Sequence, residues 1–594
     1  MAHKAKAKRQ MDPGAKAGQA RAAAPPRRWA LSAAAFVPLV VYWQILGFGF
    51  LLDDTVLFQK SDSLSDLASI PRGFLTDLGA LRKGAATVIS SYYRPVFLAL
   101  STLYYQIVAG NPAAWHFASL VLTVAISALV CGLFLRWGLP PLVALLAALV
   151  FSLHPAHVSS VAWAAGLQEL LAAFFVLLAL HAVLSAVRDD GRARPLVLAA
   201  LAYALALLSK EVAIGLPLFV GLWWLVERKI DTAKARRLLR VTAVLAGITV
   251  AYLGVRVAVR GGLATPLEGA PSFAAALPAV PVALATYLRL LLAPIGFSFF
   301  RPERPNLAWT GAQVLVALAV LAVATGLAVW AVRRRRELLL PLGWFVVWLL
   351  PVLNRWALDP QYMVTDRYLF LPSLALPWAI ALLPSRRAPR ATVAVLASLA
   401  LLFAALTVRY TAIFHDERTF VAAMAEEDPS SAFIQAEKGR LLLKDGDTAG
   451  ARAALTRSVA QNPIGPEALL MLGDLELQQG ELDAALGHYR KALVVRPYAS
   501  RGFKLAALAL ARAGRRAEAA ALADESARRW PDDFEVQLLH SLFLGAAGDH
   551  ARGQAAFDAA RTIRPNDPAV AGGYDAALAR LLPTIAPAMG APTR

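Results

Sequence analysis

The chain has 594 residues, of which 58% are hydrophobic and only 17% are charged, whereas about 25% of the residues of an ordinary soluble protein are charged, so this class is excluded. The net charge of +20 does not by itself indicate a nucleic-acid partner, because many basic residues flank apolar runs and no nucleic-acid-binding motif is present. Cys131, the single cysteine, excludes an intramolecular disulfide and a cysteine-rich metal site.

The first 28 residues are basic and carry few bulky apolar side chains, and an apolar run follows at 29–50. This run is too long for the core of a signal peptide. We therefore expect an uncleaved first transmembrane helix, preceded by a basic cytoplasmic tail at 1–28.

The sequence predicts a many-pass membrane domain at 29–413. Ten apolar runs follow the first one, near 113–135, 139–153, 165–187, 195–208, 211–226, 238–258, 311–332, 338–355, 367–384 and 391–413. Two more apolar stretches, 95–110 and 274–295, either cross the membrane or lie along its interface, so the count is 11 to 13. Eleven spans keep most basic clusters in the cytoplasm and place everything after 413 outside it. The expected location is an inner membrane.

Proline and glycine recur with a fixed spacing of 34 residues in the C-terminal part. The prolines are Pro429, Pro463, Pro497, Pro531 and Pro565, and the glycines, each 17 residues before a proline, are Gly446, Gly480, Gly514 and Gly548. This period is that of a tetratricopeptide helix-turn-helix unit. We predict a linker at 414–431, four repeats with a capping helix at 432–582, and a disordered tail at 583–594.

A repeat domain of this kind is an α-solenoid, and the predicted fold class is therefore all-α: a polytopic helical membrane bundle followed by a tetratricopeptide solenoid. The concave face of such a solenoid binds a peptide or protein partner. The alternative is a rigid spacer or a contact between two copies of the chain.

Charged and imidazole side chains gather where the predicted topology puts the outer membrane face. They are Asp53, Asp54, Arg94, His154, His157, Glu169, Lys210, Glu211, Asn354, Arg355, Asp359, Asp366, Arg367 and Tyr368. Such groups are expensive near a membrane and suggest chemistry on a lipid phosphate, with a carboxylate to activate an acceptor and cations to hold an anionic leaving group. Taken singly, each also has a structural interpretation, as a helix cap, an ion pair or a topology marker.

Several of these residues stand in longer motifs: LDDTVLF, HPAHVSSVAW, LLSKE and DRYLFLPS. With the repeats, they make the chain resemble, nearly end to end, the transmembrane and tetratricopeptide-repeat O-mannosyltransferases and their bacterial relatives. That family is similar to polyprenol-dependent glycosyltransferases of the C-type fold (GT-C), in which an acidic residue of the first outer loop is essential. The resemblance thus implies a GT-C-like membrane domain.

The resemblance also implies roles for the polar residues. Asp54, with Asp53 beside it, would be the catalytic base or a carboxylate near a metal, and a divalent cation is left open. Arg94, Lys210 and Arg367 would bind the donor phosphate. The residues expected to line the site are His154, His157, Glu169, Glu211, Asp366 and Tyr368.

The function expected from this resemblance is transfer of a sugar from a polyprenyl-phosphate donor to an acceptor hydroxyl on a protein held by the repeats. Two alternatives stay open at this point. One is a non-catalytic membrane scaffold whose repeats recruit envelope-assembly proteins, and the other is a transporter of lipid-linked saccharides.

Overall fold

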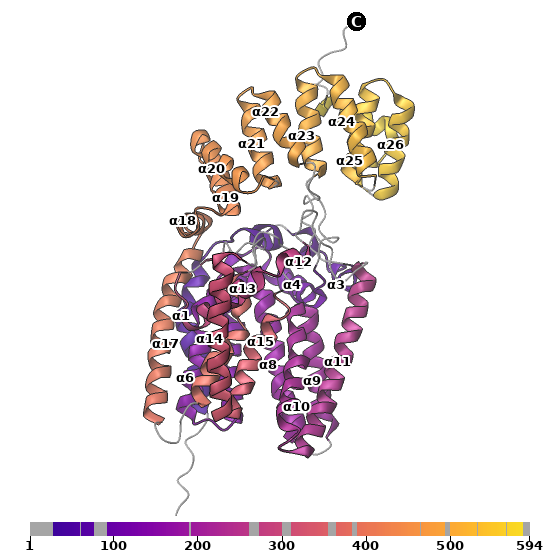
Figure 1. Ribbon diagram of the computed structural model, residues 1–594. Helices are drawn as coiled ribbons and strands as arrows, with labels where there is room; N and C mark the ends of the chain where they lie inside the picture. The colour runs from indigo at the N-terminus through magenta and orange to yellow at the C-terminus, as the bar shows by residue number, and fades with distance from the viewer. Residues whose placement is uncertain are drawn as a thin grey trace, which may run out of the picture.

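The structure, a computed structural model, describes residues 28–585 except 60, 77–91, 189–191, 261–271, 297, 300–309, 354–363, 383–388, 464, 493–498, 532 and 566. Throughout these residues the regular elements are helices, which confirms the all-α class. Figure 1 shows a bundle of helices with a curved row of helix pairs beyond one end. The predicted basic tail at 1–27, the residues Asn354, Arg355 and Asp359, and the tail from 586 lie outside the described residues.

Among the described residues, six helices of the bundle are long and apolar enough to cross a membrane. They are α1 (Arg28–Tyr42) continued by the 3-10 turn η2 (Trp43–Gly47), α5 (Pro112–Arg136), α8 (Leu167–Arg188), α11 (Thr232–Arg260), α14 (Ala312–Arg334) and α17 (Pro389–Thr411). The ends of α5 show how the sequence sets such a span. The Asn111 side chain accepts a hydrogen bond from the N–H of Ala113, and Gly138 adopts a positive φ just beyond Arg136.

A seventh candidate span is bent. Helix α6 (Pro141–Ser152) is followed by the short turn η4 (Pro155–His157) and by α7 (Val158–Val161), and the two halves meet at 50°. Pro155 has no N–H to continue the hydrogen-bond ladder of α6, which accounts for the break.

The other predicted spans form shorter helices. These are α9 (Ala193–Ser209), α10 (Gly215–Glu227), α15 (Leu339–Leu349) and α16 (Ala375–Leu382). At 1.5 Å per residue even the 17-residue α9 rises only about 26 Å, less than the roughly 30 Å of a hydrocarbon core. The count of eleven spans therefore stays a prediction. The two stretches that could cross or lie flat contain α4 (Pro95–Val108), α12 (Phe273–Ala276) and α13 (Ala279–Leu292), all at the bundle end that faces the repeats (Figure 1).

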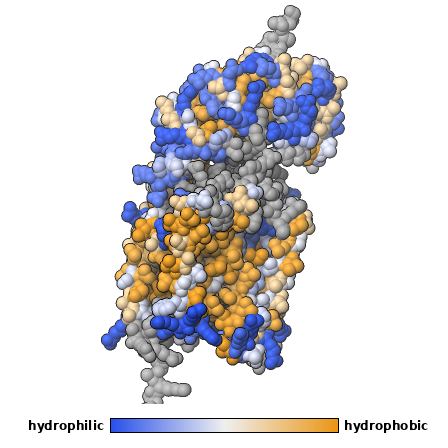
Figure 2. Space-filling view, in the orientation of Figure 1, coloured by the Kyte–Doolittle hydropathy of each residue, from blue (hydrophilic) through white to orange (hydrophobic). Residues whose placement is uncertain are grey.

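The outer surface of the bundle is apolar. Figure 2 shows a broad hydrophobic band across the visible face of the bundle, with hydrophilic residues at its far end and over the repeats. Exposed side chains of this kind include Val316 and Leu327 of α14 and Leu401 of α17, at 63%, 62% and 74% exposure. Apolar area of this extent is not left in water, and it identifies the bundle as a multi-pass membrane domain.

The repeat domain begins with α18 (Glu417–Glu427), which occupies most of the segment predicted as a linker. Four helix pairs follow: α19 (Ala432–Lys444) with α20 (Thr448–Gln461), α21 (Pro466–Gln478) with α22 (Leu482–Ala492), α23 (Ala499–Arg512) with α24 (Arg516–Arg529), and α25 (Phe534–Ala546) with α26 (His550–Ile563). A last helix, α27 (Gly573–Ile585), packs against α25. Successive pairs stack into the predicted tetratricopeptide solenoid.

The recurring glycines stand at the turns inside each pair. Gly480 connects α21 to α22 with φ +83°, a left-handed conformation that costs other residues about 1 kcal/mol or more. Small residues lie where the two helices of a pair cross, and Ala485 and Ala492 are fully buried next to Tyr489.

We predict opposite effects for two glycine substitutions in this repeat. Gly480→Ala should lower the local stability of the α21–α22 pair by about 1 kcal/mol, because alanine is strained at positive φ. Gly487→Ala, at an exposed position inside α22 with open space around it, should raise it by about 0.5–1 kcal/mol. Hydrogen exchange of the α21 and α22 amides in the full chain measures both. A rise in the local stability of the α21–α22 pair with Gly480→Ala would contradict the left-handed conformation of the turn.

Candidate functional site

Five of the predicted polar residues form one connected group, here called the ion-pair cluster: Arg94, Glu169, Lys210, Glu211 and Arg367. They come from four places in the chain: the residue before α4, the first turn of α8, the turn η6 (Glu211–Ile214) with the residue before it, and the turn η9 (Asp366–Leu369). Helix ends and turns thus converge here.

Arg94 and Glu211 form a bidentate ion pair. Nε of Arg94 donates to Oε2 of Glu211 at 3.0 Å and Nη2 donates to Oε1 at 2.6 Å. Nη1 of Arg94 donates to the side chain of Gln168, and the guanidinium lies over the ring of Tyr92 at 3.9 Å. Such a bidentate geometry fixes both partners, and Arg94 is only 4% exposed.

Glu169 is shared by the other two cations. Lys210 donates to Oε1 of Glu169, and Nε of Arg367 lies 3.8 Å from the same oxygen. The ring of Tyr368 lies 5.0 Å from the Lys210 ammonium. The cluster as defined contains three cations and two carboxylates, and the ion pair of Arg367 is the longest of the three.

Asp54 and Asp53 are adjacent in sequence but stand in different environments. The Asp54 carboxylate is fully buried and accepts hydrogen bonds from the backbone N–H groups of Leu51, Ala164 and Ala165, at 3.2, 3.3 and 2.7 Å. Burial raises the pKa of Asp54 to about 8, an effect that these three donors only partly offset. Asp53 is exposed. Asp54 therefore ties the first loop to the turn before α8.

The turn before α8 packs tightly against the first loop and against the residues just before it. The indole N–H of Trp163 donates to the carbonyl of Leu51 at 3.3 Å, which adds a second tie to the first loop. A Cβ placed on Gly166 would collide with the backbone carbonyl of Ser160, a group that cannot move aside. Only glycine fits here.

An aromatic bridge of Trp163, Phe299, Phe414 and Phe420 connects the site to the start of the repeat domain. Phe299 meets Trp163, Phe420 and Phe414 with ring centroids 5.0, 5.3 and 6.2 Å apart. The Arg367 guanidinium lies 5.1 Å from the Trp163 ring centroid and 5.8 Å from that of Phe299.

The first loop is fastened to the same region. The N–H of Gly49 donates to the carbonyl of His415 at 3.2 Å, and the Phe48 ring packs edge-on against the His415 ring. The acidic pair, the cation cluster and the base of the repeat domain thus share one neighbourhood.

The two predicted histidines lie in the break of the bent span. Nε2 of His154 is 3.3 Å from the carbonyl of Leu291, and Nε2 of His157 is 2.8 Å from Oγ of Ser373. The His157 ring stacks on Phe370 at 4.1 Å. These contacts support a packing role at the helix break, and the prediction that both histidines line the site stays untested.

The other candidates are accounted for as follows. Asp366 is buried, and Tyr368 contacts Lys210 and Arg367 through its ring. Sequence reasoning missed Gln168, Phe299 and the two backbone donors of 164–165. Gln168 adjoins a predicted acid, which is a usable signal, whereas backbone donors leave no trace in residue types. The described residues contain no group of three or more His, Cys, Asp or Glu side chains that could hold a metal ion.

Comparison with known proteins finds two related O-mannosyltransferases. The chain is 28% identical over 183 residues to human "Protein O-mannosyl-transferase TMTC4" and 28% identical over 178 residues to mouse "Protein O-mannosyl-transferase TMTC3". The predicted resemblance is thereby confirmed. The aligned part covers 28% and 29% of this chain but only 24% and 19% of those relatives.

The repeats match a known family as well. Residues 437–500 match the tetratricopeptide-repeat family. Among solved structures, "Crystal structure of APC/C hetero-tetramer Cut9-Hcn1" aligns with 82% of this chain and 90% of its own at 14% identity and a TM-score of 0.24. "Crystal structure of YrrB: a TPR protein with an unusual peptide-binding site" covers 28% of this chain and 84% of its own at 15% identity and a TM-score of 0.21.

We predict that Gly166→Ala lowers the unfolding free energy by about 1–3 kcal/mol, because the added methyl displaces the turn that holds Asp54. The control is Gly49→Ala in the first loop, where a Cβ has open space. Thermal unfolding of the full chain in detergent measures the difference. Equal melting temperatures would show that the turn relaxes freely.

A second prediction compares a buried and an exposed ion pair. Glu211→Gln leaves Arg94 buried without its carboxylate and should cost about 3–5 kcal/mol. Asp66→Asn removes the partner of Arg72 in a pair that is about half exposed, and should cost less than about 1 kcal/mol. The same unfolding experiment measures the loss of unfolding free energy for both variants. A small loss for Glu211→Gln would mean that water reaches Arg94.

Proposed function

We propose that this chain is a membrane glycosyltransferase that moves a sugar from a polyprenyl-phosphate donor to an acceptor hydroxyl. The observation that carries the proposal is the ion-pair cluster, with the long ion pair of Arg367, beside an acidic first loop. Similarity to two O-mannosyltransferases supports it. The acceptor is proposed to be a protein bound by the repeats, in a bacterial inner membrane with the repeats outside the cytoplasm.

Arg367 is the cation best placed to meet the donor phosphate. Arg94 is already held by Glu211 and Gln168, and Lys210 by Glu169, whereas the described ion pair of Arg367 is long. Arg94 and Lys210 then act as fixed positive charges that stabilise the phosphate as negative charge develops on it. The stack on Trp163 orients the Arg367 guanidinium.

We assign the role of general base to Asp53 rather than to Asp54. All the hydrogen bonds given to Asp54 come from the backbone and its side chain is covered, whereas Asp53 is exposed beside it. The acceptor oxygen attacks the anomeric carbon, its proton passes to the Asp53 carboxylate, and the bond to phosphate oxygen breaks with its electrons leaving on the lipid phosphate. Asp54 positions the loop on which Asp53 stands.

Sugar transfer in membranes tests this division of roles. Membranes expressing each variant receive radiolabelled polyprenyl-phosphate sugars and are fractionated into protein, glycan and lipid. Asp53→Asn should reduce transfer about 10²-fold or more at unchanged melting temperature. Asp54→Asn should lower both transfer and melting temperature, and Asp66→Asn, an exposed acid further along the loop, should change neither.

The outcomes separate the alternatives. Normal transfer by Asp53→Asn with loss of transfer and no loss of stability in Asp54→Asn would return the role of base to Asp54. Absence of transfer from every donor in the wild type would favour the scaffold. Translocation of labelled lipid without a new glycosidic bond would favour the transporter.

A further inference from the structure

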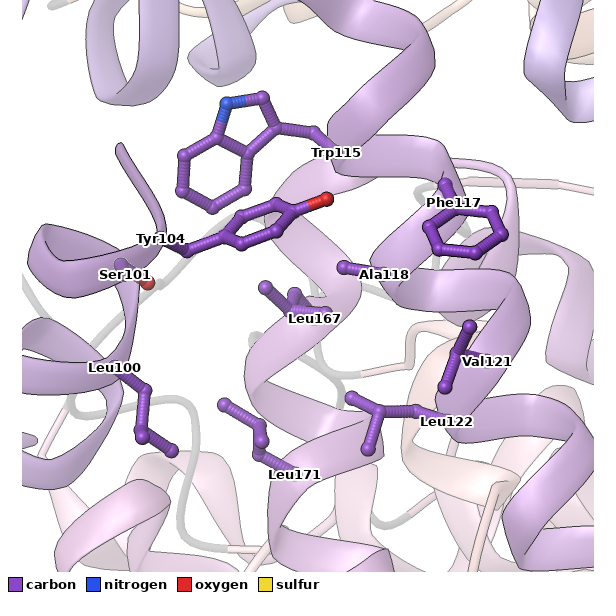
Figure 3. Close-up of a pocket in the computed structure, with 10 residues that line it drawn as sticks. All are labelled: Leu100, Ser101, Tyr104, Trp115, Phe117, Ala118, Val121, Leu122, Leu167 and Leu171. Atoms are coloured by element: carbon purple, nitrogen blue, oxygen red, sulfur yellow. The ribbon is translucent and has the colours of Figure 1, made fainter. Parts of the chain in front are cut away.

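The surface of the membrane domain offers lipids different surroundings at different places. An apolar groove of about 340 Å³ opens between α4, α5 and the first turns of α8, with Tyr104 and Trp115 at one end and Leu171 toward the other (Figure 3). None of the described residues that line it is charged. Such a surface contacts lipid tails and has no charge with which to select a headgroup.

The turn between α10 and α11 is the opposite case, and it lies at the bundle end away from the repeats (Figure 1). From Glu227 to Arg240 the sequence has six basic residues and two acidic ones. Both acids are engaged inside this hairpin. Oε1 of Glu227 accepts from Nζ of Lys234 at 2.5 Å, and Oδ1 of Asp231 accepts from the backbone N–H of Lys234 at 2.9 Å.

Four of the basic side chains are exposed and form no ion pair with any described residue: Arg228, Lys229, Arg236 and Arg240. The Arg228 guanidinium lies 5.6 Å from the centroid of the Trp224 ring, a residue type that favours the membrane interface. The end of the hairpin thus presents four positive charges without a carboxylate partner.

Two of these cations stand on the lipid-facing side of α11. Arg236 and Arg240 are one turn apart, and Leu239, Ala243 and Val250 are exposed on the same face at helical spacing. Leu239 and Val250 are 47% and 70% exposed. The part of α11 from 241 to 259 rises about 28 Å, close to the roughly 30 Å of a hydrocarbon core, which puts both arginines at the level of the headgroups.

We propose that this face of α11 binds an anionic phospholipid, with the phosphodiester at Arg236 and Arg240 and the acyl chains along Leu239 and Ala243. Charge complementarity selects this occupant, because a guanidinium binds phosphate oxygens in a forked geometry and a zwitterionic lipid brings its own cation beside the phosphate. Arg228 and Lys229 are placed in the adjoining turn to add to the positive potential.

The inference does not depend on the proposed function. Nη1 of Arg237 donates to the carbonyl of Val187 in the last turn of α8, whereas Glu169 of the ion-pair cluster stands in the first turn of the same helix. The proposed lipid site and the cluster are therefore at opposite ends of a 22-residue helix.

Photocrosslinking in nanodiscs tests the site. The full chain carries p-benzoylphenylalanine in place of Leu239 and is placed in equal amounts of phosphatidylglycerol and phosphatidylcholine with matched acyl chains. We expect at least about fivefold more phosphatidylglycerol adduct than phosphatidylcholine adduct at 239. The control carries the same group in place of Phe117, which is 54% exposed at the uncharged groove, and should give the two adducts in nearly equal amounts.

Two double variants separate a site from a general attraction. Arg236→Gln with Arg240→Gln should lower the lipid preference at 239 to the ratio found at 117. Arg333→Gln with Arg334→Gln removes two exposed charges from the end of α14 and should leave that preference unchanged. All four side chains are exposed, so both double variants should keep the melting temperature of the parent.

Two results would overturn the proposal. One is an equal yield of both adducts at 239 in the parent, which would mean that the arginines do not select a headgroup. The other is an equal loss of preference in the two double variants, because the attraction would then come from the total charge of the protein and not from this face of α11.

Discussion

A charge buried in an apolar bundle must be paired, and the ion-pair cluster is how this chain meets that constraint. Arg94 and Lys210 are 4% and 3% exposed, and each is met by a carboxylate from another part of the chain. Because the partners come from α8 and η6, the pairs also fix how the ends of α4, α8 and α9 approach one another. The local fold of the site depends on this electrostatic requirement.

The same requirement shapes the acidic loop. A carboxylate cannot be buried without donors, and the turn before α8 supplies two backbone N–H groups to Asp54 while Leu51 supplies a third. One aspartate is thereby committed to holding the loop, and its neighbour is left accessible. The two adjacent aspartates therefore stand in different environments, Asp54 buried and Asp53 exposed.

The sequence predicted the repeats and several of the long helices, but not the ion pairs of the site. The period of 34 residues is visible in the sequence because each repeat needs the same turn and the same close crossing of its two helices. The turn glycines and the buried Ala485 meet these two needs. Long apolar runs likewise predicted α5, α8 and α17. The partner of Arg94 was not readable, because Glu211 is 117 residues away and pairing is a property of the tertiary structure.

The aromatic bridge has a thermodynamic consequence for how the two parts of the protein work together. Phe299 touches Trp163 on one side and Phe420 of α18 on the other, so the wall beside Arg367 is built partly by the repeat domain. Whatever shifts α18 changes the surroundings of that guanidinium. If a partner of the solenoid shifts α18 on binding, linkage requires that this partner and a ligand of the membrane site alter each other's affinity by the same factor.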